Sequence, residues 1–484
     1  MMLNNKLKGV IGVVSENRIM KIEYIKEKEV KEFKMKRTLF IVFVSVFVFS
    51  SLFVFIASKN GGKEGDMPFE GRTLRIAWAE FAPSDALQVL SNKMFTPETG
   101  IKVIVEQTPW SDFVQKYNAE LIAGGDAWDI ICGDSQDVGN GAERGHYLEI
   151  TDFFDEYDVR DKFTPETLTA FGEWPKGSGR MYGVPALTDP TFFVYRMDLF
   201  EDSQHKAAFK AKFGYDLDVP ETWDQLNDIA TYFYEDVDGM YGIALYGDNG
   251  YDSLNMFAET IIWCYGGDLG DFNSMQVKGI VNSPGSIAGI EAYRKLFSMS
   301  PPGMGTAFFE EVNNAFISGI VPMIFNYTAT LPVMENKETN PYYGKTGYFV
   351  TPKQKAQYTS LGGQAMNVIT YAEKNHDIVM EYLKWWISEE TQLAYAQYPG
   401  CFNGSYAIMN SKEYVAASGL NKISAESVPY LKDWWAVPEY AQTIRTFAET
   451  VGRYVVGGEG TAKQAMDSVA EQWHEVFDKA GYYD

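Results

Sequence analysis

Short apolar runs alternate with amphipathic segments over the first part of the acidic body of this chain. The runs at 73–79, 101–106 and 128–132 are apolar or alternate in polarity, which is typical of strands. Between them, 85–94 and 112–123 carry apolar residues at the three- and four-residue spacing of a helix. Strands and helices that alternate at this pace predict a parallel sheet in an α/β fold.

The same helical spacing recurs later in the chain. These later helices are predicted at 222–234, 286–299, 310–318, 377–390 and 463–480. No repeat of fixed period is present, which argues against a solenoid or a propeller. Ligands of open α/β sheets bind beyond the carboxyl ends of the strands, so the residues that follow the three predicted strands are the first candidates for a site.

An uncharged apolar run of 19 residues occupies 39–57 and follows Lys34, Lys36 and Arg37. A basic segment before an apolar run is typical of an export signal, and 19 residues also suffice to span a membrane. A cleaved signal and an uncleaved anchor therefore both remain open, and both place the rest of the chain outside the cytoplasm. We expect a non-native or disordered extension at 1–34, the signal or anchor at 35–58 and a linker at 59–69.

Charge narrows the classes of partner. The 484 residues carry a net charge of −23, and the part after residue 58 holds 32 basic and 60 acidic residues, a charge of −28. Such an acidic body repels phosphate backbones, which excludes nucleic acid as a partner and disfavours anionic ligands. Aromatic residues make up 15% of the chain, more than a core alone requires, which suits a surface that grips an amphipathic ligand.

The chain lacks the usual signatures of catalysis and metal binding. Cys132, Cys264 and Cys401 are far apart, and the four histidines show no ligand spacing, so no disulfide framework, metal site or cofactor is expected. No nucleophile elbow or phosphate-binding loop occurs. Two carboxylates of a glycoside-processing enzyme stay possible, because 60 acidic residues always include candidate pairs.

Seven short motifs occur in a fixed order between about 72 and 480. They are WDII with GHYLEI (128–131, 145–150), RMYGVP with FVYRMDLF (180–185, 193–200), VPETWDQL (219–226), GGD (266–268), AFISGIVPM (315–323), LGG (361–363) and EYLKWW (381–386). In this order they resemble the family 1 extracellular solute-binding proteins of bacterial ABC transporters, the sugar-type group that includes maltose-binding protein.

The resemblance implies a two-lobed α/β periplasmic-binding-protein fold of type II. Each lobe would be a central sheet flanked by helices, and the chain would cross the hinge three times, near 188–191, 321–327 and 366–371. The implied lobes are 70–189 with 325–368 (N-lobe) and 190–322 with 370–484 (C-lobe). Two lobes joined by a hinge bury a small ligand in the cleft and close over it.

Candidate ligand-binding residues come from the strand ends and from positions equivalent in the family. From the first lobe and the crossings they are Trp78, Phe81, Trp110, Asp134, Ser135, Gln136, Asp189, Asn326, Tyr327, Gly363 and Gln364. From the other lobe they are Glu259, Trp263, Asn403, Trp434, Trp435 and Tyr440, with the tandem Trp434-Trp435 expected as an exposed stacking platform. Aromatic faces beside polar acceptors favour a neutral polyol such as a mono- or oligosaccharide.

The resemblance therefore predicts a receptor and not an enzyme. We expect a monomeric, exported protein, in the periplasm or on the outer face of the cytoplasmic membrane, which 39–57 would tether. It would bind a carbohydrate and deliver it to the permease subunits of an ABC importer. Two alternatives remain: the glycoside-processing enzyme, and a sensor subunit that presents its ligand to a membrane kinase.

Overall fold

The computed structural model describes residues 67–250, 253–271, 273–434 and 436–483. The predicted extension, the signal or anchor and most of the linker lie outside these residues, as does Trp435. Met67–Asp484 group by their contacts into one unit. Within the described part of the chain, no helix combines the length and the apolar character needed to cross a membrane.

The described residues form eight strands that pair in the order β2-β1-β3-β7-β4-β5, with β6 on β4 and β8 on β7. Their bounds are β1 (Thr73–Ala79), β2 (Lys102–Thr108), β3 (Ile130–Asp134), β4 (Gly183–Arg196), β5 (Met323–Tyr327), β6 (Thr346–Phe349), β7 (Thr359–Val368) and β8 (Leu431–Lys432). Strands β1, β2 and β3 run parallel, as the sequence predicts. Strands β7, β4, β5 and β6 join them antiparallel, so the sheet as a whole is mixed.

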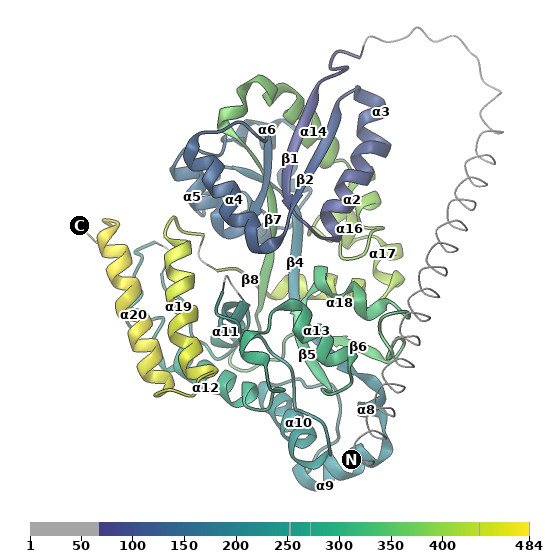
Figure 1. The fold of residues 1–484 in the computed structure, drawn as a ribbon, viewed down its shortest axis with the longest axis vertical. Coiled ribbons are helices and arrows are strands. Elements are labelled where there is room, and N and C mark those ends of the chain that lie inside the picture. Colours follow the sequence, from purple (N-terminus) through teal and green to yellow (C-terminus); the bar gives the residue numbers. More distant parts are fainter. Residues whose placement is uncertain (1–66, 251–252, 272, 435, 484) are drawn as a thin grey trace, which may run out of the picture. The chain divides into compact units, whose positions relative to one another are not determined.

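Strand β4 is common to both lobes. Gly183–Pro190 pair with β7 in the first lobe, and the following residues, 191–196, pair with β5 and β6 in the second. All but one of its fourteen residues are buried. Figure 1 shows β4 running from the region of β1, β2 and α4 to that of β5, β6 and α10. A single extended strand thus connects the two lobes, and the residues near its middle lie where they meet.

Helices cover both lobes. In chain order they are α2 (Ala82–Leu90), α3 (Thr96–Thr99), α4 (Trp110–Ala123), α5 (Val138–Glu143), α6 (Thr151–Glu156), α7 (Pro165–Phe171), α8 (Met197–Glu201), α9 (Ser203–Phe213), α10 (Trp223–Asp236), α11 (Ser253–Cys264), α12 (Pro284–Phe297), α13 (Phe309–Ile317), α14 (His376–Trp386), α15 (Glu389–Tyr395), α16 (Tyr406–Met409), α17 (Lys412–Ala417), α18 (Gly419–Ser427), α19 (Tyr440–Val455) and α20 (Ala462–Lys479). Every helix predicted from spacing is present within three residues at its start, and the segment 377–390 forms α14 and the beginning of α15.

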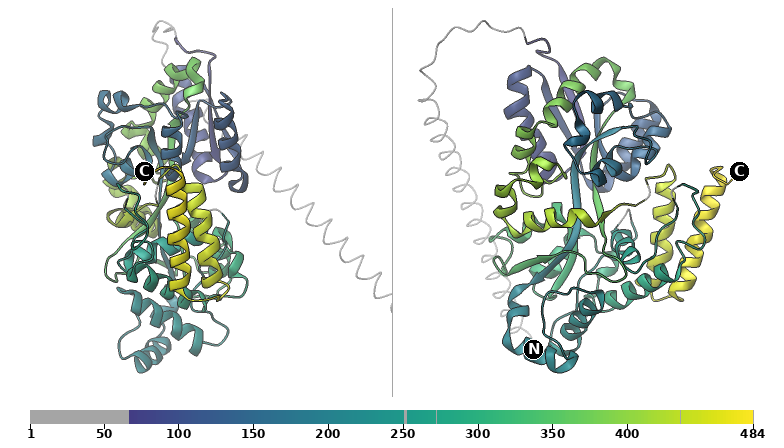
Figure 2. Two further views of the ribbon diagram at one scale, coloured as in Figure 1. Left: turned by 90° about the vertical axis from the view of Figure 1, so that its left-hand side faces the viewer. Right: turned by 180° about the vertical axis from the view of Figure 1, so that it is seen from behind.

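Local sequence explains where α10 and α20 begin. The Thr222 hydroxyl accepts from the backbone amide of Gln225 at the start of α10, and the Gln225 side chain accepts in return from the Thr222 amide. Thr461 and Gln464 form the same reciprocal cap at the start of α20. Such caps satisfy amides that have no partner within the helix. Figure 2 shows α19 and α20 side by side, and the Trp473 indole donates to the Thr443 carbonyl at 2.9 Å between them.

Contacts of two later segments divide the lobes differently from the expected boundaries. Tyr382 of α14 packs edge-on against Phe95 at 5.0 Å between ring centroids and hydrogen-bonds to Ser91, both beside α2. Phe349 of β6 stacks on Phe193 at 5.0 Å, in the second-lobe half of β4. Residues 376–386 thus pack in the first lobe and 346–349 in the second, the opposite of the division drawn from the family resemblance.

Candidate functional site

A small cavity lies where the end of β3, the middle of β4 and the start of β7 meet α13 of the second lobe. Its volume is about 40 Å³. The residues that line it are Trp110, Asp134, Gln136, Asp189, Phe309, Tyr327, Gly362, Gly363 and Gln364. Seven of these nine are among the predicted ligand-binding residues, Gly362 was named only as part of the LGG motif, and Phe309 was not predicted. We call this space the central cavity.

Asp134 and Gln364 form the polar wall of the central cavity. They are directly opposite each other in the antiparallel pair of β3 and β7. The Gln364 amide donates to the Asp134 carboxylate at 2.7 Å, and its oxygen accepts from the Trp78 indole at 3.4 Å. Trp78 is fully buried and reaches the cavity only through Gln364. The predicted stacking role of Trp78 is therefore replaced by a positioning role in this structure.

Two glycines of β7 let neighbouring groups lie close to the backbone of the strand. A Cβ at Gly362 would meet the Tyr327 ring at 2.5 Å, and one at Gly363 would meet the Leu187 carbonyl oxygen at 2.1 Å. Gly363 also has φ +122°, a conformation that side chains disfavour. The pair allows Tyr327 to lie against the strand, so these glycines serve the packing of the cavity wall.

Asp189 lies on β4 at the junction of the lobes and is 8% exposed. Its carboxylate accepts from the backbone amide of Ala329 at 2.8 Å, at the start of the 3-10 helix η5 (Thr328–Glu335). Burial raises the pKa of Asp189 to about 8, because a charge is poorly solvated there, and the Ala329 hydrogen bond opposes this only in part. The carboxylate faces the central cavity and ties the strand shared by the lobes to the second lobe.

Gln136 connects the end of β3 to the segment after β8. Its amide donates to the carboxylate of Asp433 at 3.3 Å. Burial raises the pKa of Asp433 to about 6, while nearby Lys176 acts in the opposite direction. Ser135 is fully buried beside them. Asp433 was missed by sequence reasoning, although it directly precedes the Trp pair that was singled out.

Aromatic rings line both sides of the central cavity. Trp110, half-buried at the start of α4, packs edge-on against Phe81 at 5.4 Å, and Phe81 packs against Trp78 at the same distance. Of these three, Trp110 alone lines the cavity. On the second lobe, Phe309 packs edge-on against Tyr327 at 5.9 Å. Phe309 begins α13, one residue before the helix predicted at 310–318, and nothing in the sequence singled it out.

Two predicted residues support the cavity wall from behind. The Tyr327 hydroxyl lies 3.2 Å from the Ser360 hydroxyl, which in turn donates to the Glu259 carboxylate. Asn326 is fully buried, donates to the Phe309 carbonyl at 3.1 Å and accepts from Tyr246 at 2.5 Å. Glu259 and Asn326 thus orient Tyr327 and Phe309 and do not line the cavity.

The structure does not bring the remaining predicted residues to the central cavity. Trp263 is buried beneath Lys432, whose ammonium lies 5.1 Å from its ring, and Asn403 hydrogen-bonds to Gln392 in the core. Trp434 is 2% exposed and packs edge-on against Phe447 and Trp473, so it is not an exposed platform. Tyr440 is buried at the start of α19, and Trp435 lies outside the described residues.

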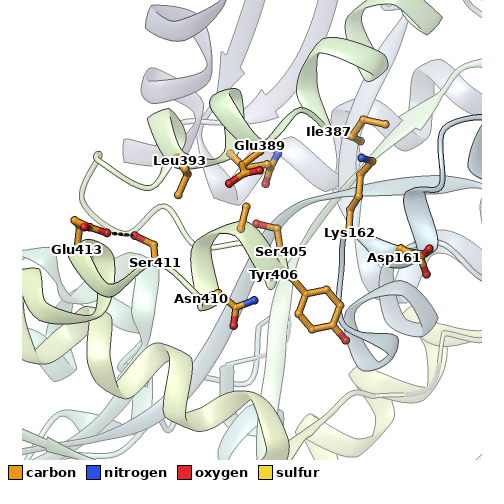
Figure 3. Close-up of a pocket in the computed structure, with 12 residues that line it drawn as sticks. Asp161, Lys162, Ile387, Glu389, Leu393, Ser405, Tyr406, Asn410, Ser411 and Glu413 are labelled. Atoms are coloured by element: carbon orange, nitrogen blue, oxygen red, sulfur yellow. Dashed lines mark hydrogen bonds between the residues drawn. The ribbon is translucent and has the colours of Figure 1, made fainter.

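Larger hollows lie elsewhere on the surface. Figure 3 shows one of about 470 Å³, here called the outer hollow, formed by α15, α16, α17 and the segment at Asp161 and Lys162. Its charged groups, including Glu389 and Glu413, belong to surface side chains, and none of the predicted site residues lines it. In the described residues no group of three or more His, Cys, Asp or Glu is placed to hold a metal ion. The central cavity is therefore the candidate site.

The fold and the inter-lobe position of the cavity define a class, the two-lobed solute-binding proteins. The chain belongs to the bacterial extracellular solute-binding protein family, whose sequence model matches residues 78–393. The resemblance read from the seven motifs is thereby confirmed. The two-lobed α/β fold is confirmed by solved structures of the same architecture.

One of these is a solute-binding protein of an ABC transporter from Agrobacterium radiobacter K84, in complex with ribitol. It has a TM-score of 0.71 and 21% identity, and the match covers 84% of this chain and 100% of that one. A maltose-bound protein of T. maritima, MalE3, also gives 0.71, at 19% identity with the same coverage. A third, from Agrobacterium vitis S4 with bound D-mannitol, gives 0.68 at 18% identity, covering 85% and 99%.

Sequence comparison finds a mannitol-binding protein of Pseudomonas aeruginosa. It is 22% identical over 333 residues, which are 63% of this chain and 71% of the relative.

Proposed function

We propose that this chain is the solute-binding receptor of an ABC importer and binds a carbohydrate, a sugar or a sugar alcohol, in the central cavity. The observation that carries the proposal is the cavity itself, which joins two carboxylates, two side-chain amides and three aromatic side chains at the junction of two lobes. Carboxylate and amide groups match the hydroxyls of a polyol, and aromatic faces match its C–H surface. Relatives whose ligands are ribitol, mannitol and maltose support this ligand class.

The size of the cavity supports a mechanism of opening and closing. Its volume of about 40 Å³ is far below the roughly 300 Å³ or more of ordinary ligand pockets. A sugar therefore enters only when the lobes move apart, with β4 and β7 as the strands that flex. Closure over the ligand would give the permease a shape to recognise, and the sugar would leave unchanged.

The proposal includes an exported protein that acts outside the cytoplasm as a monomer with permease subunits as partners. Family membership supports export, and the apolar run at 39–57 would supply the signal or tether.

Calorimetric titration of the full chain with a panel of sugars and sugar alcohols tests the ligand class. We expect at least one to bind with a dissociation constant in the micromolar range or tighter. If no carbohydrate binds while an amino acid or a metal ion does, the ligand class is wrong. Chromatography of an oligosaccharide after incubation tests for turnover, because a receptor returns it intact and a glycoside-processing enzyme does not.

A further inference from the structure

Both charged residues that line the central cavity are acidic, and two further acids lie behind its wall. Asp134 and Asp189 line it, Asp433 lies behind Gln136, and Glu259 lies behind Tyr327 through Ser360. None of the nine described residues that line the cavity is Lys, Arg or His. A neutral ligand that entered as the lobes close would leave this excess of acidic groups in place.

Of these acidic groups, Asp189 restricts the charge of the ligand most strongly. It is nine-tenths buried, and one backbone amide is the hydrogen-bond donor that the structure gives its carboxylate. Burial of a carboxylate without a cation is costly, and the same burial raises the pKa of Asp189. Lobe closure removes more water and increases the cost, unless the ligand brings a positive charge.

Other titratable groups around Asp189 do not offset its charge. Asp134 and Tyr327 line the same cavity, and Tyr395 of α15 interacts with Asp189 from the first lobe. The cation in this region, Lys176, interacts with Asp433, and burial lowers the pKa of Lys176. The groups named around Asp189 are acids and tyrosines, so none of them brings a positive charge to it.

The aromatic side chains of the central cavity and the net negative charge of the protein also favour a cationic ligand. Trp110, Tyr327 and Phe309 present rings to the cavity, and ring faces attract ammonium groups. The acidic body, with its charge of −28 after residue 58, raises the local concentration of cations around the protein. Acidic and aromatic groups together are a recognition surface for a protonated amine.

We propose that the preferred ligand is a polyol or sugar that carries a protonated amino group, and that the ammonium pairs with the carboxylate of Asp189. This inference rests on the carbohydrate-binding function proposed above and specifies the chemical class of its ligand. The hydroxyls of the same ligand would use Asp134, Gln136 and Gln364. Asp189 is then the residue that distinguishes an aminated ligand from its neutral counterpart.

The test compares matched ligands on the full chain by calorimetry. The pair is D-glucitol and 1-amino-1-deoxy-D-glucitol, which differ in one hydroxyl replaced by an amine, and the pair of D-glucose and D-glucosamine serves as the cyclic equivalent. We expect the amine of at least one pair to bind about tenfold or more tightly, as a charge-assisted contact in a buried site should. The affinity of the amino-glucitol should rise from pH 6 to pH 9, because Asp189 ionises while an alkyl amine keeps its proton to about pH 10.

Asp189→Asn removes the ionisable group and keeps the fold, because an asparagine still has an oxygen that accepts from the Ala329 amide. We expect this variant to lose the preference for the amine and the pH dependence, so that the ratio of the amine and neutral affinities approaches one. Glu413→Gln, in the outer hollow, is the matched charge control and should keep both. Neutral ligands that bind as tightly as their amines, or an amine preference that survives Asp189→Asn, overturn this inference and leave the receptor function standing. Binding of no carbohydrate, aminated or neutral, overturns the receptor function itself.

Discussion

Gln364 and Asp134 face each other across β7 and β3, and the Gln364 amide donates to the Asp134 carboxylate at 2.7 Å. The same glutamine accepts from the buried Trp78 indole. One side chain thus connects the core of the first lobe to the polar wall of the central cavity. Its orientation is fixed by both contacts, which presents a defined set of polar groups to a ligand.

Replacement of Gln364 by leucine should weaken ligand binding and lower stability together. Leucine has a similar volume but leaves the Asp134 carboxylate without this donor and Trp78 without its acceptor. An unsatisfied buried polar group costs about 1–3 kcal/mol, which lowers the free energy of unfolding. Loss of the Gln364 amide from the cavity wall should lower the affinity by about tenfold or more. Calorimetry and thermal unfolding measure the two effects, and Gln204→Leu, at an exposed position of α9, is the control. An affinity equal to that of the wild type would show that Gln364 does not contribute to ligand binding.

Trp434 and Trp110 should respond differently to truncation. Trp434 packs in the core against Phe447 and Trp473, so Trp434→Ala should reduce the free energy of unfolding by about 3–5 kcal/mol. Trp110 is half-buried and lines the cavity, so Trp110→Ala should chiefly weaken binding, by about 1–3 kcal/mol. Urea unfolding and titration of both variants distinguish the roles. If the Trp434→Ala protein has normal stability and fails to bind the ligand, Trp434 belongs to the binding site.

The cavity residues that were predicted came from two sources: three from the ends of strands, and Asp189, Tyr327, Gly363 and Gln364 from hinge crossings and positions equivalent in the family. Asp134, Gln136 and Trp110 follow strands that the apolar pattern locates well, and the topology of a parallel sheet brings such ends together. The predicted residues that do not line the cavity include Trp78 and Phe81 of the first lobe, but most come from the group expected in the other lobe. Whether an indole such as that of Trp434 faces solvent or a core depends on α19 and α20, which pack on it from later in the chain.

The sequence pattern also did not determine in which lobe each later helix packs. The family resemblance assigned 370–484 to the second lobe, but α14 packs on the segment that directly follows α2, through Tyr382 and Phe95. An amphipathic helix shows that one face is buried and does not show against which sheet. That choice depends on contacts between residues nearly 300 positions apart, such as Ser91 and Tyr382.

The three cysteines should be unreactive in the folded protein. Cys132, Cys264 and Cys401 are buried and unbridged, and burial raises the pKa of Cys264 to about 11. The reactive form of a thiol is the thiolate, so a thiol reagent at pH 8 should label none of them before unfolding and all of them after it. Mass spectrometry of the labelled chain gives the count. Rapid labelling of any cysteine under native conditions would contradict the packing described for it.

Asp189 should make the stability of the unliganded protein depend on pH above neutrality. Its pKa is raised to about 8 in the folded state and is about 3.9 when unfolded, so between these values the folded form alone holds the proton. The stabilisation from this proton is fully present below about pH 4 and is lost as the pH rises through 8, with a slope of up to about 1.4 kcal/mol per pH unit.

The raised pKa values of Asp137 and Asp433, both about 6, confine their effects to lower pH. Of these three carboxyl groups, Asp189 alone still changes protonation between pH 6.5 and 8, so the difference between the wild type and Asp189→Asn gives its contribution. Urea unfolding across this interval should give a decline in stability for the wild type and a much flatter curve for Asp189→Asn, whereas Asp433→Asn should retain the decline. Parallel curves for the wild type and Asp189→Asn would show that Asp189 is ionised well below pH 8 in the folded protein. The cost of burying its charge, on which the preference for an aminated ligand depends, would then be absent.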